Sequence, residues 1–72
     1  MSGLPQLSGA EVAGALRRAR FEDVSQRGSH PKLRHADGRT VIVPMHRSLA
    51  RGTLASILRQ AQLDADAFSK LL

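Results

Sequence analysis

The sequence contains no cysteine, no tryptophan and no tyrosine, and only two of its 72 residues are phenylalanine. Without cysteine, no disulfide can staple the fold and no thiolate can act as a nucleophile or a metal ligand. The two aromatic residues, Phe21 and Phe68, both occupy positions that are expected in the core. No exposed stacking surface is therefore predicted, which argues against single-strand nucleic-acid binding of the RRM or OB-fold type.

Long apolar segments are also missing from the chain. No run approaches the ~18 residues that a membrane-spanning helix requires. The N-terminal stretch MSGLPQLSG has neither the basic region nor the apolar region of a signal peptide. We therefore expect a cytoplasmic protein with no membrane partner. The length predicts one small domain over residues 1–72 with a thin core, and residues 1–6 are expected to form a flexible N-terminal segment.

Acidic residues are scarce, since six Asp and Glu oppose eleven Lys and Arg and leave a net charge of +5. The excess is uneven, because the only acidic residue between Arg27 and Arg59 is Asp37. A basic surface of this kind is typical of proteins that bind polyanions, and it favours nucleic acid as a partner. An acidic protein partner stays open as an alternative, and one surface can serve both partners.

Helical segments are predicted at the two ends of the chain. Ser8 and Glu11 have the spacing of a capping box, and the apolar residues after them predict a helix over residues 9–19. From Thr53 onward, apolar residues recur at the i, i+3, i+4, i+7 spacing of a second helix. Asp64 is a suitable N-cap for a short third helix.

Between the helices, the sequence has the alternation and the turn residues that are typical of strands. Sequential strands joined by tight turns form an antiparallel meander. With helices covering one face, this order predicts an α+β fold, α-β-β-β-α, with a short extra C-terminal helix. The expected strands span about residues 21–27, 30–35 and 39–43, with turns at Gly28-Ser29 and Asp37-Gly38.

The stretch RGSHPKLRH, residues 27–35, combines histidines with permanent cations. Alternation along a strand places His30, Lys32 and Arg34 on one face, about 6.6 Å apart, and His35 on the core side. Metal-free RNA cleavage needs a base for the 2′-OH proton, an acid for the leaving oxygen and cations for the negative charge. Histidine suits the proton transfers because its ordinary pKa, about 6.5, is close to working pH. A histidine in a basic strand is nevertheless more often a plain surface residue.

The other histidines are weaker candidates for chemistry. His46 follows Pro44 at the start of a basic loop and can face the same groove, whereas His35 is interpreted as structural. His30 and His35 have opposite parity on one strand and no neighbouring cysteine or carboxylate, which argues against a metal site built with His46. We therefore predict neither a metal nor any other cofactor.

Three stretches together resemble one known family: LSGAEVAGAL, RGSHPKLRHADGRTVIVPMH and LARGTLASILRQA. Over about residues 7–68, this combination resembles the HicA toxins of bacterial HicAB toxin–antitoxin pairs. The resemblance implies a fold similar to a double-stranded RNA-binding domain. It also implies a metal-independent RNA endonuclease, an mRNA interferase, that is neutralised by a HicB-like antitoxin in a hetero-oligomeric complex.

The resemblance carries expectations for individual residues. The catalytic histidine of the family's G-S-H motif corresponds to His30, which the turn at Gly28 and Ser29 is expected to position. A non-catalytic RNA-binding module of the same fold stays open as the alternative. The expected RNA and phosphate contacts are Lys32, Arg34, Arg27, Arg39, Arg47 and Arg51.

The chain departs from the family pattern at three positions. The family usually has glycine after the first helix and after the second, where this chain has Arg20 and Gln62. Those glycines suit left-handed positions at helix ends. Pro31 directly follows His30 and lacks a backbone donor, so we expect the strand to begin irregularly or at a sheet edge there.

Overall fold

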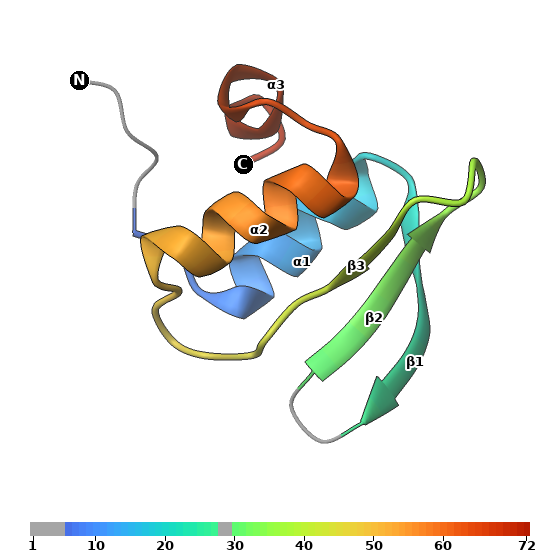
Figure 1. Ribbon diagram of the computed structural model, residues 1–72, viewed down its shortest axis with the longest axis horizontal. Coiled ribbons are helices and arrows are strands. Elements are labelled where there is room, and N and C mark those ends of the chain that lie inside the picture. The colour runs from blue at the N-terminus through green and yellow to red at the C-terminus, as the bar shows by residue number, and fades with distance from the viewer. Residues whose placement is uncertain (1–5, 28–29) are drawn as a thin grey trace.

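The computed structural model describes residues 6–27 and 30–72, and its α+β order is the predicted one (Figure 1). Except for Gln6, the expected flexible segment 1–6 lies outside the described residues, and so does the expected turn at Gly28-Ser29. The elements are α1 (Gly9–Arg18), β1 (Phe21–Arg27), β2 (His30–His35), β3 (Thr40–Ile42), α2 (Arg51–Ala61) and α3 (Ala65–Ser69).

The three strands form an antiparallel sheet in the order β1-β2-β3, with β2 in the centre. Helices α1 and α2 lie on one side of this sheet, where α1 contacts β1 and α2 contacts β3 (Figure 1). The opposite face of β2 is left uncovered by the described helices. The core between the layers is formed by buried apolar residues, the largest of which are Leu16, Phe21, Leu33, Ile57 and Phe68.

Local signals set where most helices begin. The predicted capping box is present, because the Ser8 hydroxyl accepts from the Glu11 backbone N–H at 3.1 Å and the Glu11 carboxylate accepts from the Ser8 N–H at 2.9 Å. Asp64 caps α3 as predicted. Helix α2 begins at Arg51, two residues before the predicted start, and its N-cap has no side-chain hydrogen bond that the sequence could signal. Over residues 6–27 and 30–72, the helices are too short and too polar to cross a bilayer.

The expected sheet edge at Pro31 is wrong, because Pro31 belongs to the central strand and its side chain is buried. The alternative, an irregular start of the strand, agrees with the structure, since β2 pairs with β3 only from Lys32 onward. Its carbonyl accepts from the Val43 N–H at 3.1 Å. In a hydrogen-bonded antiparallel pair the second bond would run from residue 31 back to residue 43. Proline has no N–H to donate it. The ladder therefore weakens at this pair, and β3 ends at Ile42, just before it.

Both helix ends where the family usually has glycine adopt positive φ angles, 75° at Arg20 and 57° at Gln62. At the second of these, the Leu63 N–H donates to the Leu58 carbonyl at 3.0 Å and the Gln62 N–H donates to the Arg59 carbonyl at 3.1 Å. This pattern is a Schellman motif with a non-glycine residue in its left-handed position. A left-handed conformation costs an L-residue roughly 1–2 kcal/mol relative to glycine.

The Gln62→Gly variant is expected to be more stable than the wild type by about 0.5–1 kcal/mol, since part of the gain is offset by the freer unfolded chain. For a domain of this size, that gain raises Tm by roughly 2–8 °C in thermal unfolding. Gln62→Ala is the matched control, because alanine keeps the Cβ atom and therefore the strain. Equal stability of the two variants would contradict the proposed source of the strain.

Candidate nuclease site

Burial alternates along β2 as a strand with one covered face requires. Pro31 and Leu33 are buried, His30 and Arg34 are exposed, and Lys32 is half-buried. Since the helices cover the side of Leu33, the three polar side chains belong to the uncovered face. The predicted grouping of His30, Lys32 and Arg34 on one face therefore agrees with the structure.

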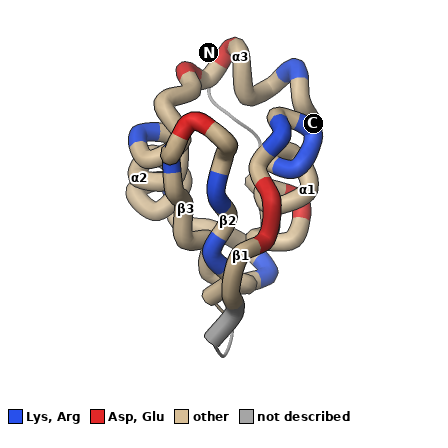
Figure 2. Tube along the Cα trace, turned by 90° about the vertical axis from the view of Figure 1, so that its right-hand side faces the viewer, with Lys and Arg blue, Asp and Glu red and all other residues tan. Residues whose placement is uncertain are grey.

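The neighbouring strands make the two ends of this face chemically different. Arg34 lies opposite Glu22 of β1 and Thr40 of β3, and its Nε atom lies 3.4 Å from the Thr40 hydroxyl. Figure 2 shows Lys and Arg positions along β2 and an acidic stretch on the neighbouring β1. Lys32 instead lies opposite uncharged neighbours on both strands. The end of the face near His30 is thus farther from the Glu22 carboxylate than the end near Arg34.

A second imidazole lies beside His30. The ring centroids of His30 and His46 are 6.3 Å apart, with their planes at 80°, and both side chains are exposed. His46 comes from the segment that follows β3, while His30 is the first residue of β2. The sequence pointed to His46 as a weaker candidate able to face the same groove, and the structure brings the two histidines together.

The segment that carries His46 is held against the start of α1. The His46 carbonyl accepts from the Gly9 N–H at 2.9 Å. Gly9 is buried, and a Cβ atom added there would overlap the Pro44 carbonyl oxygen and lie 2.9 Å from the Met45 Cα atom. The contact is therefore between backbones, and only glycine permits it.

Arg39 is engaged at the opposite, hairpin end of β2. Its Nε atom donates to both carboxylate oxygens of Asp37, at 3.0 and 2.9 Å, and its Nη1 atom donates to the Ala61 carbonyl at 2.6 Å. The guanidinium also lies 5.2 Å from the centre of the Phe21 ring. It holds the pKa of Asp37 below its ordinary value through the hydrogen bond. These contacts tie the hairpin to the end of α2 and leave Arg39 less available for phosphate than the sequence suggested.

His35 has contacts that agree with its structural interpretation. Its ring meets the ring of Phe21 edge to face at 5.2 Å between centroids. Its Nδ1 atom accepts from the Asp37 N–H at 3.1 Å. His35 is thus half-buried at the hairpin, packed against Phe21 of the core, on the face away from His30.

The remaining predicted RNA contacts are Arg47, Arg51 and Arg27. Arg47 and Arg51 are exposed, the first directly after His46 and the second at the start of α2. Arg27 is described by its backbone, which pairs with His30 across β1 and β2. Within residues 6–27 and 30–72, no three side chains of the kinds that bind metals gather at one place.

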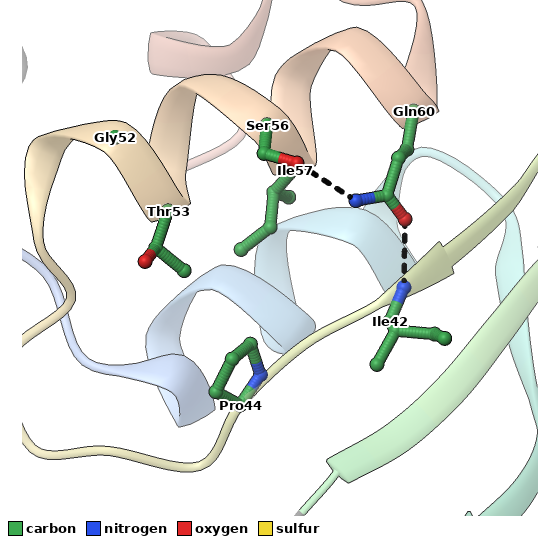
Figure 3. Close-up of a pocket in the computed structure, with 7 residues that line it drawn as sticks. All are labelled: Ile42, Pro44, Gly52, Thr53, Ser56, Ile57 and Gln60. Atoms are coloured by element: carbon green, nitrogen blue, oxygen red, sulfur yellow. Dashed lines mark hydrogen bonds between the residues drawn. The ribbon is translucent and has the colours of Figure 1, made fainter.

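A groove of about 380 Å³ lies between β3 and α2 (Figure 3). The Gln60 amide spans it, since it accepts from the Ile42 N–H at 3.1 Å and donates to the Ser56 hydroxyl at 3.2 Å. Gln60 therefore satisfies a backbone donor on the outer edge of β3 that another strand would otherwise pair with. Sequence reasoning did not predict this groove, although five of its lining residues lie in the stretch LARGTLASILRQA, because neutral side chains do not by themselves mark a pocket. The lining residues are Ile42, Pro44, Gly52, Thr53, Ser56, Ile57 and Gln60.

Comparison with known proteins identifies the family. Residues 9–63 match the protein-family model described as "HicA toxin of bacterial toxin-antitoxin". This match contains all three strands and the whole of α2. No curated protein matches the chain. Because the matched region covers well over half of the 72 residues, the chain belongs to the HicA toxin family of bacterial toxin–antitoxin systems.

Proposed function

We propose that this toxin is an RNA endonuclease of the mRNA-interferase kind, which cleaves RNA without a metal ion. The observation that carries the proposal is the placement of exposed His30 on the uncovered face of the sheet, together with Lys32 and Arg34. An imidazole beside two cations offers a proton-transfer group next to groups that neutralise phosphate charge. Membership in the HicA family supports the same reading.

In the proposed reaction, the 2′-oxygen of a nucleotide attacks the adjacent phosphorus and the 5′-oxygen of the next nucleotide leaves. His30 transfers one of the two protons that this exchange requires. Lys32 and Arg34 bind the non-bridging phosphate oxygens, and Arg47 and Arg51 contact flanking phosphates. Arg27 and Arg39 are weaker candidates for such contacts, and Gly28 with Ser29 would position His30. The products are a 2′,3′-cyclic phosphate and a 5′-hydroxyl.

The proposed protein partner is a HicB-like antitoxin that covers the uncovered face of β2 in a hetero-oligomeric complex. The family membership implies an antitoxin in general. The net charge of +5 supports a partner that presents acidic groups to this face. Such a partner would occupy the positions of the RNA phosphates and thereby block cleavage.

Purified toxin is expected to cleave an end-labelled single-stranded RNA in the presence of excess EDTA, because the proposed groups are protein side chains. The cleavage ends are analysed for a 2′,3′-cyclic phosphate, which treatment with acid or a phosphatase distinguishes from a linear phosphate. Loss of cleavage in the chelator with recovery on adding a divalent cation would contradict the metal-independent mechanism. So would products with 5′-phosphate ends.

A non-catalytic RNA-binding module is the second candidate, and the surplus of cations favours it independently of His30. It predicts RNA binding whose affinity falls by roughly 0.7–0.9 log units per decade of salt for each phosphate contacted. The same labelled RNA would then be retained by the protein without being cut. Intact RNA after prolonged incubation, with binding of this salt dependence, would replace the ribonuclease proposal with this one.

A further inference from the structure

We propose that His46 is the second proton-transfer group of the site, so that His30 and His46 divide the two proton transfers of RNA cleavage between them. The inference rests on the proposed ribonuclease function and adds a catalytic residue to it. It starts from the 6.3 Å separation of the two ring centroids on the exposed side of the molecule.

The separation of the rings lets both imidazoles reach oxygens of one phosphate. A proton-transfer group must come within about 2.6–3.2 Å of the oxygen that it serves. The ring nitrogens extend beyond the centroids and each can reach about 2.6–3.2 Å further, so two rings 6.3 Å apart can contact two oxygens of one phosphate. Because the attacking and leaving oxygens lie on opposite sides of the phosphorus, the phosphate would lie across the open side of the pair, with one imidazole at each oxygen.

At the His30 end of the uncovered face, the two histidines are better placed for proton transfer than any carboxylate. Among the described residues, no carboxylate lies within the 4.0 Å ion-pairing distance of either ring. Glu22, a carboxylate on β1, lies opposite Arg34 at the other end of β2. The charged residues nearest to the pair along the chain and across the sheet are cations, which suit phosphate binding: Lys32, Arg47 and Arg27, whose backbone pairs with His30. A second acid or base is thus needed, and His46 supplies it.

Backbone contacts fix the position of the segment that carries His46. Pro31 weakens the ladder where the chain leaves β3, and the buried Gly9 receives the segment Pro44 to His46 in a close backbone contact. Both rings of the pair are exposed, so their edge-to-face contact adds little to the stability of the fold. The arrangement places His46 firmly without making it part of the core.

The reaction balances with these two groups alone. A neutral imidazole accepts the 2′-OH proton as the oxygen–phosphorus bond forms, and becomes an imidazolium. The other imidazole begins protonated and donates its proton to the 5′-oxygen as the phosphorus–oxygen bond breaks. The products are the cyclic phosphate and the free 5′-hydroxyl, and the two histidines have exchanged protonation states. Proton exchange with solvent through their exposed rings restores the starting state.

The first test compares wild type, His46→Phe and His46→Ala on one RNA. Phenylalanine keeps an aromatic ring beside His30 but cannot transfer a proton. Both variants are expected to lose cleavage by about 100-fold or more, with RNA affinity and Tm close to wild type. The wild-type rate should rise and then fall with pH, and each variant should lose one limb of that profile. Wild-type rates in His46→Phe would overturn the proposal, and so would a loss explained by weaker RNA binding or a lower Tm.

The second test separates the two roles with a substrate in which sulfur replaces the bridging 5′-oxygen at one position. A thiolate leaves without protonation, so the variant that lacks the general acid should recover most of its rate. Recovery of either His30→Ala or His46→Ala, but not of both, supports the division of roles; recovery of neither or of both overturns it. If the wild type cleaves and needs His30 but not His46, only this inference fails. If the wild type cleaves no RNA, the proposed function fails as well.

Discussion

His30→Ala is expected to lower the rate of RNA cleavage by about 10²–10⁴-fold and to abolish growth arrest when the toxin is expressed. The reason is that alanine removes a proton-transfer group while leaving Lys32 and Arg34 in place to bind phosphate. His30 is exposed at the end of its strand, so the substitution leaves the core intact. The single-turnover cleavage rate and the RNA dissociation constant are the measurements that separate chemistry from binding.

His35→Ala is the matched control on the same strand. His35 belongs to the opposite face and packs against Phe21, so its removal should lower Tm while the folded protein still cleaves RNA. The two variants are thus expected to have opposite outcomes. His35→Ala should keep activity and lose stability, whereas His30→Ala should keep stability and lose activity. A folded His30→Ala variant that cleaves RNA and arrests growth like the wild type would rule out the assigned role.

Much of the fold could be predicted from the sequence, because the signals that start helices and form turns involve only a few neighbouring residues. The capping box at Ser8 and Glu11 fixes where α1 begins, and Asp37-Gly38 fixes the hairpin, where Gly38 has a φ of 102°. Strand parity also predicted which side of β2 each residue faces, since burial of Leu33 determines the side of its neighbours. The predicted start of α2 was less accurate, because its N-cap residue Ala50 provides no side-chain hydrogen bond that the sequence could signal.

What the sequence could not supply are contacts between distant parts of the chain. Arg39 was expected to contact RNA from charge alone, yet the structure engages it with Asp37 in its own hairpin and with the carbonyl of Ala61. A charge pattern gives the sign of a side chain's charge but does not reveal which groups that side chain contacts. Of the two alternatives expected for Pro31, the sheet edge was wrong for a similar reason, because a missing donor is tolerated in a central strand where the ladder is about to end.

The proximity of His46 to His30 depends on the same kind of long-range packing. The sequence placed His46 near the end of a strand, which is consistent with several directions for the loop. The direction is set by backbone bonds: the Gly9 N–H donates to the His46 carbonyl at 2.9 Å, and the Leu49 N–H donates to the Leu7 carbonyl at 2.8 Å. Both bonds join the segment after β3 to the start of α1, so the fold of the N-terminal region helps to build the candidate site.

The same substitution at two glycines of α1 should therefore have opposite effects. Gly9→Ala is expected to destabilise the protein by about 2–3 kcal/mol, because a Cβ atom there overlaps the Pro44 backbone and nothing flexible can move aside. Gly14→Ala places a Cβ atom where no atom lies within 4 Å, so it should gain roughly 1 kcal/mol of helix propensity. In thermal unfolding, Tm should fall by more than about 8 °C for the first and rise by about 4–8 °C for the second.

Cleavage by the two glycine variants then connects this backbone contact to the site. Measured well below its Tm, Gly9→Ala should cleave RNA more slowly than the wild type, because the overlap displaces the segment that carries His46. Gly14→Ala should cleave at the wild-type rate, since it touches neither that segment nor β2. Equal Tm values for the two variants would contradict the close contact between α1 and the segment after β3. A folded Gly9→Ala variant with full activity would instead show that the close contact at Gly9 is not needed to position His46.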